Sequence, residues 1–79
     1  MTITRFPFEF YDFATHRFIA RRYYTVCDGM YDVIEADAGH FADIEGVEID
    51  IVGCAVMPSG AIGGRDRCGI RVRPSAWVA

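Results

Sequence analysis

Apolar and polar residues alternate with a period of two in several stretches of the chain, and this pattern restricts the fold more than any other feature. Phe6, Phe8 and Phe10 fall on one side of an extended segment, and Glu9 falls on the other side. Residues 47–52 alternate in the same way. Successive side chains of a β-strand point to opposite faces of a sheet, so the pattern predicts half-buried strands.

Size and composition limit the chain to one small domain. With 79 residues it is long enough for a single domain, which we expect to span residues 1–79. Leu, Lys, Asn and Gln do not occur, so the core must be built mainly from Phe, Tyr, Ile, Val and Ala. A domain of this size buries only about 60% of its unfolded surface, so association with a second copy would add stability.

The Asp28-Gly29 dipeptide is the clearest turn signal in the sequence. Asp-Gly is typical of two-residue type I′ loops, because both loop positions need positive φ angles. We therefore expect residues 21–27 and 30–36 to form the two strands of a hairpin. That register places Arg22 opposite Glu35, an opposite-charge pair that contributes roughly 0.2–1 kcal/mol.

The remaining segments predict one short helix and further strands. Pro7 lacks an N–H donor, which indicates an edge strand or a bulge in the first strand. Residues 10–22 have two interpretations, a turn between strands or a helix, because their aromatic residues also lie at helical spacing. A helix is expected over 38–45, with Asp37 as N-cap and Gly46 at its end. A strand over 47–57 with a bulge at Gly53 follows, and then a glycine-rich loop over 58–66. The last strand is expected over 68–73, where Pro74 ends it, and Trp77 is expected to pack the tail back.

These elements together predict the α+β class. About five mainly antiparallel strands would form a curled sheet or a small barrel, accompanied by one short helix. No secretory signal precedes the first strand, and the longest apolar run, over 51–57, is far shorter than a membrane span. We therefore expect a cytoplasmic protein.

No residue pattern indicates catalysis, a cofactor or a metal. The three Cys and two His lack the close pairs that zinc sites use, and the glycine-rich loop lacks the Lys of a phosphate-binding loop. Cys27 and Cys54 have apolar neighbours, which predicts that both are buried. We expect no enzyme activity and no bound cofactor.

Cys68 differs from the other two cysteines in its surroundings. It lies between Arg65-Asp66-Arg67 and Gly69, at the start of a predicted edge strand. Nearby arginines favour the thiolate, and a strand edge can pair with a second copy across a two-fold axis. The sequence therefore predicts a homodimer whose interface includes Cys68, which becomes covalent when Cys68 is oxidised; a free surface thiol is the alternative.

Charge is strongly segregated along the sequence. Residues 23–64 carry eight acidic side chains and no Lys or Arg, whereas the eight arginines lie in the segments on either side. This pattern favours an acidic surface that binds a basic partner, although a merely solvated surface would show it too. Glu48 and Asp50 are expected to point to solvent on one strand, about 6.5–7 Å apart, close to the spacing of charges along a nucleic-acid backbone. The candidate partner-binding residues are Asp32, Glu35, Asp37, Asp43, Glu45, Glu48 and Asp50.

In its small size, its acidic block from Asp28 to Asp50 and its lack of a catalytic constellation, the chain resembles the phage-encoded anti-CRISPR proteins. The resemblance implies an inhibitor that binds a positively charged CRISPR surveillance complex and blocks its DNA binding, in some members as a dimer. Two alternatives stay open. One is a structural or assembly protein of a phage particle, and the other is a single-stranded nucleic-acid-binding module that uses the aromatic and Arg side chains; the net charge of −3 argues against direct nucleic-acid binding.

Overall fold

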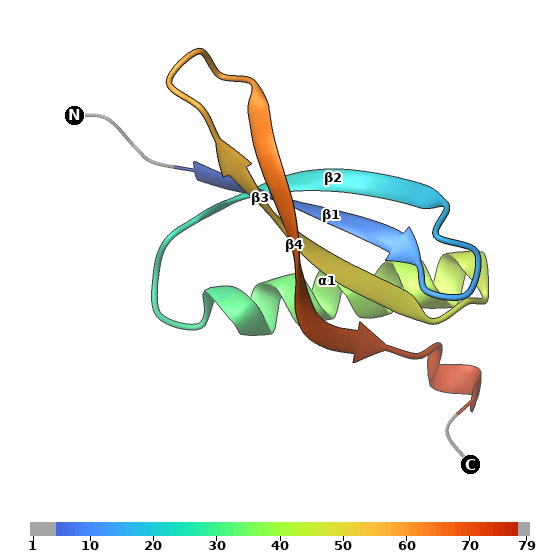
Figure 1. Cartoon of the computed structure of the whole chain (residues 1–79). Coiled ribbons are helices and arrows are strands. Elements are labelled where there is room, and N and C mark those ends of the chain that lie inside the picture. The colour runs from blue at the N-terminus through green and yellow to red at the C-terminus, as the bar shows by residue number, and fades with distance from the viewer. Residues whose placement is uncertain (1–4, 78–79) are drawn as a thin grey trace.

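The computed structural model describes residues 5–77, which form four β-strands, one α-helix and one 3-10 turn (Figure 1). In chain order these are β1 (Arg5–Asp12), β2 (Phe18–Thr25), α1 (Met30–Glu45), β3 (Ile49–Val56), β4 (Ile62–Val72) and η1 (Ser75–Trp77). Neighbouring strands are antiparallel and follow the order β2-β1-β3-β4. The α+β class is confirmed. The predicted five strands and barrel are wrong for these residues, because the sheet has four strands and is open.

A tight turn between β1 and β2 is built on the side chain of Asp12. Its Oδ1 accepts the backbone N–H of Ala14 at 2.9 Å and that of Thr15 at 3.3 Å. Its carbonyl accepts the N–H of His16 at 2.8 Å, and His16 has a positive φ of 61°. Asp side chains commonly organise turns in this way, by accepting hydrogen bonds from the backbone a few residues on. Residues 10–22 are therefore strand, turn and strand, and the helical interpretation is wrong.

The Asp28-Gly29 dipeptide begins the helix instead of closing a hairpin, so the predicted hairpin is wrong. Gly29 has a φ of 80° and is the N-cap of α1. A type I′ turn needs positive φ at both loop positions, but among residues 5–77 only His16 and glycines have it. Residues 30–36 are helical, and Arg22 lies opposite Phe8 of β1 rather than opposite Glu35.

Helix α1 is longer than expected because its buried residues recur every four positions. Ile34, Ala38 and Ala42 are buried on the side that faces the sheet. The small side chains of Ala38 and Ala42 allow the helix to pack close to the strands. Gly46 ends the helix with a φ of 68°, and its N–H donates to the carbonyl of Ala42 at 2.8 Å. The predicted end at Gly46 is confirmed, whereas Asp37 lies inside the helix and is not its N-cap.

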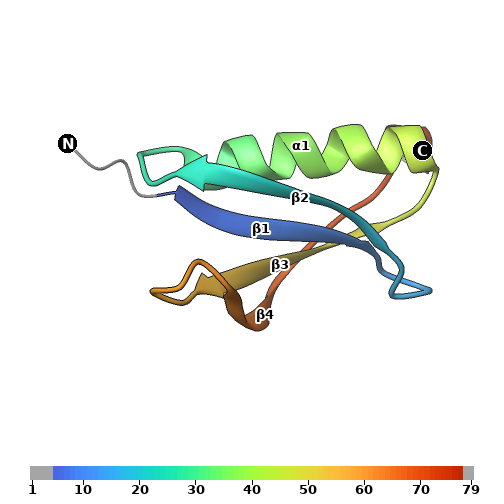
Figure 2. The same cartoon turned by 90° about the horizontal axis from the view of Figure 1, so that it is seen from above.

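The core lies between α1 and one face of the sheet (Figure 2). Figure 2 shows the helix on one side of the sheet, and within residues 5–77 no helix or strand covers the opposite face. Phe6, Phe8 and Phe10 lie on the helix side of the sheet as expected; Phe8 and Phe10 are buried, whereas Phe6 lies at the rim and is 40% exposed. The buried cluster comprises Phe8, Phe10, Tyr24, Ile34, Ala38, Ala42, Ile49 and Ile51. The opposite face, named here the open sheet face, is covered among residues 5–77 by strand side chains and by Phe13 and His16 of the turn between β1 and β2.

The strand order decides two expectations about the sheet edges. β1 is an inner strand, so of the two alternatives that Pro7 predicted the edge is wrong and the bulge remains. Pro7 is tolerated because pairing with β3 begins only at Phe8, and β1 also has an irregularity between Phe10 and Tyr11. β4 is an edge strand, as expected around Cys68, but it begins at Ile62 within the predicted loop.

Candidate functional site

The seven acidic residues predicted to bind a partner do not form one surface. Glu48 lies in the connection from α1 to β3, and Asp50 lies on β3. The other five lie on α1: Asp32, Glu35, Asp37, Asp43 and Glu45. Because Figure 2 places the helix and the open sheet face on opposite sides of the molecule, the predicted set is divided between two surfaces.

Several of the helix acids already have partners within the chain. Asp43 accepts the N–H of Ser75 at 2.7 Å and its hydroxyl at 2.9 Å, which ties η1 to the helix and lowers the pKa of Asp43. Asp37 accepts the hydroxyl of Tyr24 at 2.6 Å. Glu45 lies 3.5 Å from Arg17.

Trp77 is 54% exposed, so the expectation that it packs the tail back is wrong.

Asp32 and Glu35 are exposed and have no ion pair among residues 5–77. They are three positions apart on α1, so they lie on one side of the helix. Tyr31, which is 52% exposed, precedes them in the first turn. We name Tyr31, Asp32 and Glu35 the α1 acidic surface.

The expectation that Glu48 and Asp50 point freely to solvent is wrong. Asp50 is buried, and its carboxylate lies 3.4 Å from Nε of Arg67 on β4. Glu48 is half-buried and lies 3.9 Å from both Arg71 and Arg73. The alternation itself is confirmed, because Ile49 and Ile51 point into the core. Antiparallel pairing of β3 with β4 brings these acids under arginines that the sequence places far away.

The most unusual residue of the open sheet face is Glu9 on β1. Its side chain has no solvent exposure although no helix covers it. Arg21 of β2 donates to Oε2 from Nε at 2.9 Å and from Nη2 at 2.7 Å. Arg65 of β4 and the hydroxyl of Tyr11 each donate to Oε1 at 2.7 Å. Burial alone would raise the pKa of Glu9, but these donors outweigh it and lower the pKa to about 2.

Sequence reasoning missed this arrangement because its partners come from three strands. Arg21, Glu9 and Arg65 become neighbours only when the order β2-β1-β3-β4 is known. The one signal available was the charge of Glu9 within an aromatic, alternating strand. A shallow cavity of about 390 Å³ lies next to this cluster, and its lining residues are Tyr11, His16, Asp50, Val52, Arg65 and Arg67.

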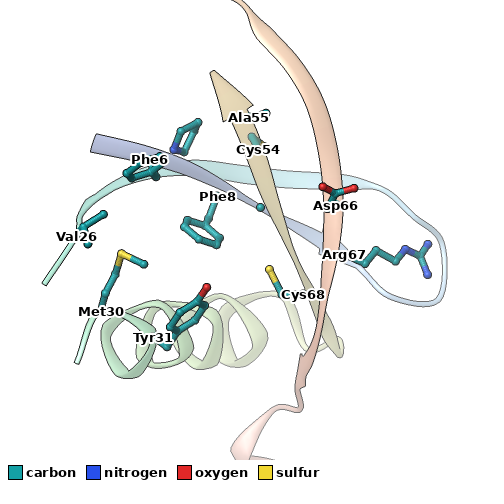
Figure 3. Close-up of a pocket in the computed structure, with 12 residues that line it drawn as sticks. Phe6, Phe8, Val26, Met30, Tyr31, Cys54, Ala55, Asp66, Arg67 and Cys68 are labelled. Atoms are coloured by element: carbon teal, nitrogen blue, oxygen red, sulfur yellow. The ribbon is translucent and has the colours of Figure 1, made fainter. Parts of the chain in front are cut away.

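A second cavity, of about 460 Å³, opens between the first turn of α1 and the sheet (Figure 3). Figure 3 shows Phe8, Met30, Tyr31 and Cys68 around it, while the side chain of Arg67 points away. Cys68 therefore lies on the helix side of β4 and is only partly exposed. Burial, with smaller contributions from nearby acids, raises the pKa of its thiol, so the expected thiolate is not favoured.

The other two cysteines also differ in exposure. Cys54 is buried, as expected, and burial raises the pKa of its thiol. Cys27 is exposed, so the expectation of burial is wrong there. Within residues 5–77, no three His, Cys, Asp or Glu side chains are close enough together to hold a metal ion. No helix in that part of the chain is long and apolar enough to cross a membrane.

Comparison with protein-family models, with curated proteins and with solved structures found no significant match to this chain.

Proposed function

We propose that this protein is a small inhibitor, similar in kind to anti-CRISPR proteins, that acts in the cytoplasm of a bacterial host. It binds a positively charged protein complex that handles nucleic acid and blocks DNA binding by that complex. It does so without enzyme activity or a cofactor. The observation that supports this proposal most is the α1 acidic surface, where Asp32 and Glu35 are exposed and unpaired among the described residues.

The two carboxylates of the α1 acidic surface have no counter-charge in the neighbouring part of the sequence. Residues 23–64 contain no Lys or Arg, so the side chains next along the helix do not neutralise Asp32 and Glu35. Asp32 lies in the first turn of α1, where the helix dipole stabilises negative charge. A basic partner would therefore replace solvent around these two carboxylates. Tyr31 adds an exposed ring of the kind that anchors protein interfaces.

The test measures DNA binding by purified CRISPR surveillance complexes in a gel-shift assay with excess inhibitor. We expect wild-type protein to prevent the shift for at least one complex, and Glu35→Lys to raise the half-inhibitory concentration about tenfold or more, because like charges then face each other. Glu45→Lys is the matched control, because it makes the same change of net charge ten positions further along α1, at the other end of the helix from Tyr31 and Asp32. Failure to inhibit any complex, or equal loss in both variants, contradicts the proposal.

The alternative, an assembly protein of a phage particle, is favoured by the two sheet edges. β2 and β4 each pair with another strand on one side only, so a second copy can add to either edge. In this alternative, and in the homodimer that includes Cys68, copies associate through β4. Sedimentation of the wild-type protein over a concentration series would then show dimers or larger assemblies, whereas an inhibitor that acts as a monomer would show one species.

A further inference from the structure

The open sheet face presents positive charge to solvent, although the whole chain is negative. Five arginines and three carboxylates pair on this face, in ion pairs with Glu9, Glu48 and Asp50. The carboxylates lie underneath: the side chain of Glu9 has no exposure and that of Asp50 has 6%, whereas that of Arg67 is 59% exposed. An approaching ligand therefore meets guanidinium groups first.

These guanidinium groups keep donors for a ligand. A guanidinium has five N–H donors in a planar fork. Arg65 donates from Nε to Glu9, and its terminal nitrogens make no other hydrogen bond among residues 5–77. Arg21 uses Nε and Nη2 for Glu9, so Nη1 is left. Glu9 thus positions two arginines without using all their donors, and such forks match the geometry of phosphate oxygens.

Exposed aromatic rings lie beside these arginines. Tyr23 on β2 is 55% exposed and lies opposite Pro7 of β1, two positions from Arg21 and therefore on the same face. Phe18 is 49% exposed and packs edge-on against Tyr11, with ring centroids 5.7 Å apart. Along β2, Tyr23 and Phe18 are about 16 Å apart at the rise of a strand, a distance that several nucleotides span.

We propose that the open sheet face binds single-stranded nucleic acid, with bases stacked on Tyr23 and Phe18 and phosphates bound by Arg65 and Arg67. Rings supply stacking that is tolerant of base sequence, and the guanidinium forks supply the phosphate contacts. The cavity of about 390 Å³ between Tyr11 and Arg67 provides room for one base beside the Glu9 cluster. This site is separate from the α1 acidic surface, so either can fail without the other.

The test is fluorescence anisotropy with a labelled oligothymidine of about twelve nucleotides at low salt. We expect wild-type binding that weakens steeply as salt rises from about 50 to about 200 mM, because phosphate contacts release counterions. Tyr23→Ala should weaken binding about tenfold, and Tyr23→Phe should retain it because the ring remains. Trp77→Ala is the matched control: Trp77 is 54% exposed but lies in η1, which contacts α1, so the loss of its ring should change little.

Three outcomes overturn the proposal. The first is no binding of oligothymidine by wild-type protein at low salt. The second is equal weakening by Tyr23→Ala and Trp77→Ala, which would show that the open sheet face is not the site. The third is tighter binding to poly-glutamate than to oligothymidine, which would assign the face to an acidic protein. Arg21 and Arg65 are left unchanged in this design because their loss would leave Glu9 buried without its ion pairs.

Discussion

At the scale of single residues, Glu9 combines complete burial with a full set of hydrogen-bond donors. Its carboxylate is fully covered, but what covers it is the donors of Arg21, Arg65 and Tyr11 rather than a hydrophobic layer. A buried charge is stable only when it is paired and hydrogen-bonded. The side chains that satisfy Glu9 therefore have fixed positions on the open sheet face. Tyr11 has a raised pKa mainly because its hydroxyl donates to this carboxylate.

The low pKa of Glu9 predicts a loss of stability in acid. The folded pKa is about 2, below the ordinary value of 4.5. The stabilisation is therefore complete above about pH 4.5 and is lost as the pH falls towards 2. We expect the difference in unfolding free energy between wild type and Glu9→Gln to shrink by up to about 3 kcal/mol over this window, measured by urea titration. A difference that stays constant with pH would falsify the assignment.

Cysteine exposure predicts an order of reactivity. Cys27 is exposed, Cys68 is partly exposed with a raised thiol pKa, and Cys54 is buried with a raised thiol pKa. Because the exposed thiolate is the reactive form, iodoacetamide should label Cys27 first and Cys54 last in native protein, as read by peptide mass spectrometry. If Cys68 reacts first, this order is wrong. The homodimer expectation is tested separately, by a covalent dimer on a non-reducing gel that Cys68→Ser should abolish.

At the scale of elements, the helix shows where sequence patterns are decisive and where they mislead. Gly46 was recognised as the helix end because glycine readily adopts positive φ there. The sequence predicts a strand for the first half of α1 because Asp28-Gly29 is typical of a hairpin loop and the hairpin register would pair Arg22 with Glu35. What decides the conformation is the stripe of Ile34, Ala38 and Ala42 packed against the sheet. This packing outweighs the local preference of residues 30–36 for a strand, and it can be recognised only once the positions of the partner strands are known.

Two matched glycine-to-alanine substitutions, one at the helix end and one on β4, test this helix boundary. Gly46 has a φ of 68° and open space around its Cα, so Gly46→Ala introduces backbone strain without a clash. We expect it to lower the free energy of unfolding by about 1 kcal/mol, measured by urea titration. Gly64 on β4 also has open space but no positive φ, so Gly64→Ala should be neutral or slightly stabilising. Equal losses in both variants would contradict this explanation of the helix end.

At the scale of the whole molecule, the sequence predicts the fold class but not the distribution of charge. The alternation of residues 6–10 and 47–52 correctly identified β1 and β3. The charges of each sequence segment predict that Glu48 and Asp50 are free acids, because the sequence does not show which strands pair with one another. The arginines of β4 lie against that part of the sheet, whereas within residues 5–77 the helix acids form no ion pair with them. Of the predicted acidic site, only the residues in the first half of α1, Asp32 and Glu35, therefore remain as candidates.

The separation of an acidic helix from a sheet face covered with arginines gives the molecule an electric dipole moment. The field of a charged partner exerts a torque on such a dipole and turns the molecule before the two surfaces touch. A basic complex would draw α1 towards itself, and a polyanion would draw the open sheet face. The rate of productive encounter then depends on orientation as well as on the net charge of −3. Added salt shortens the range of this torque to about 10 Å at 0.1 M ionic strength.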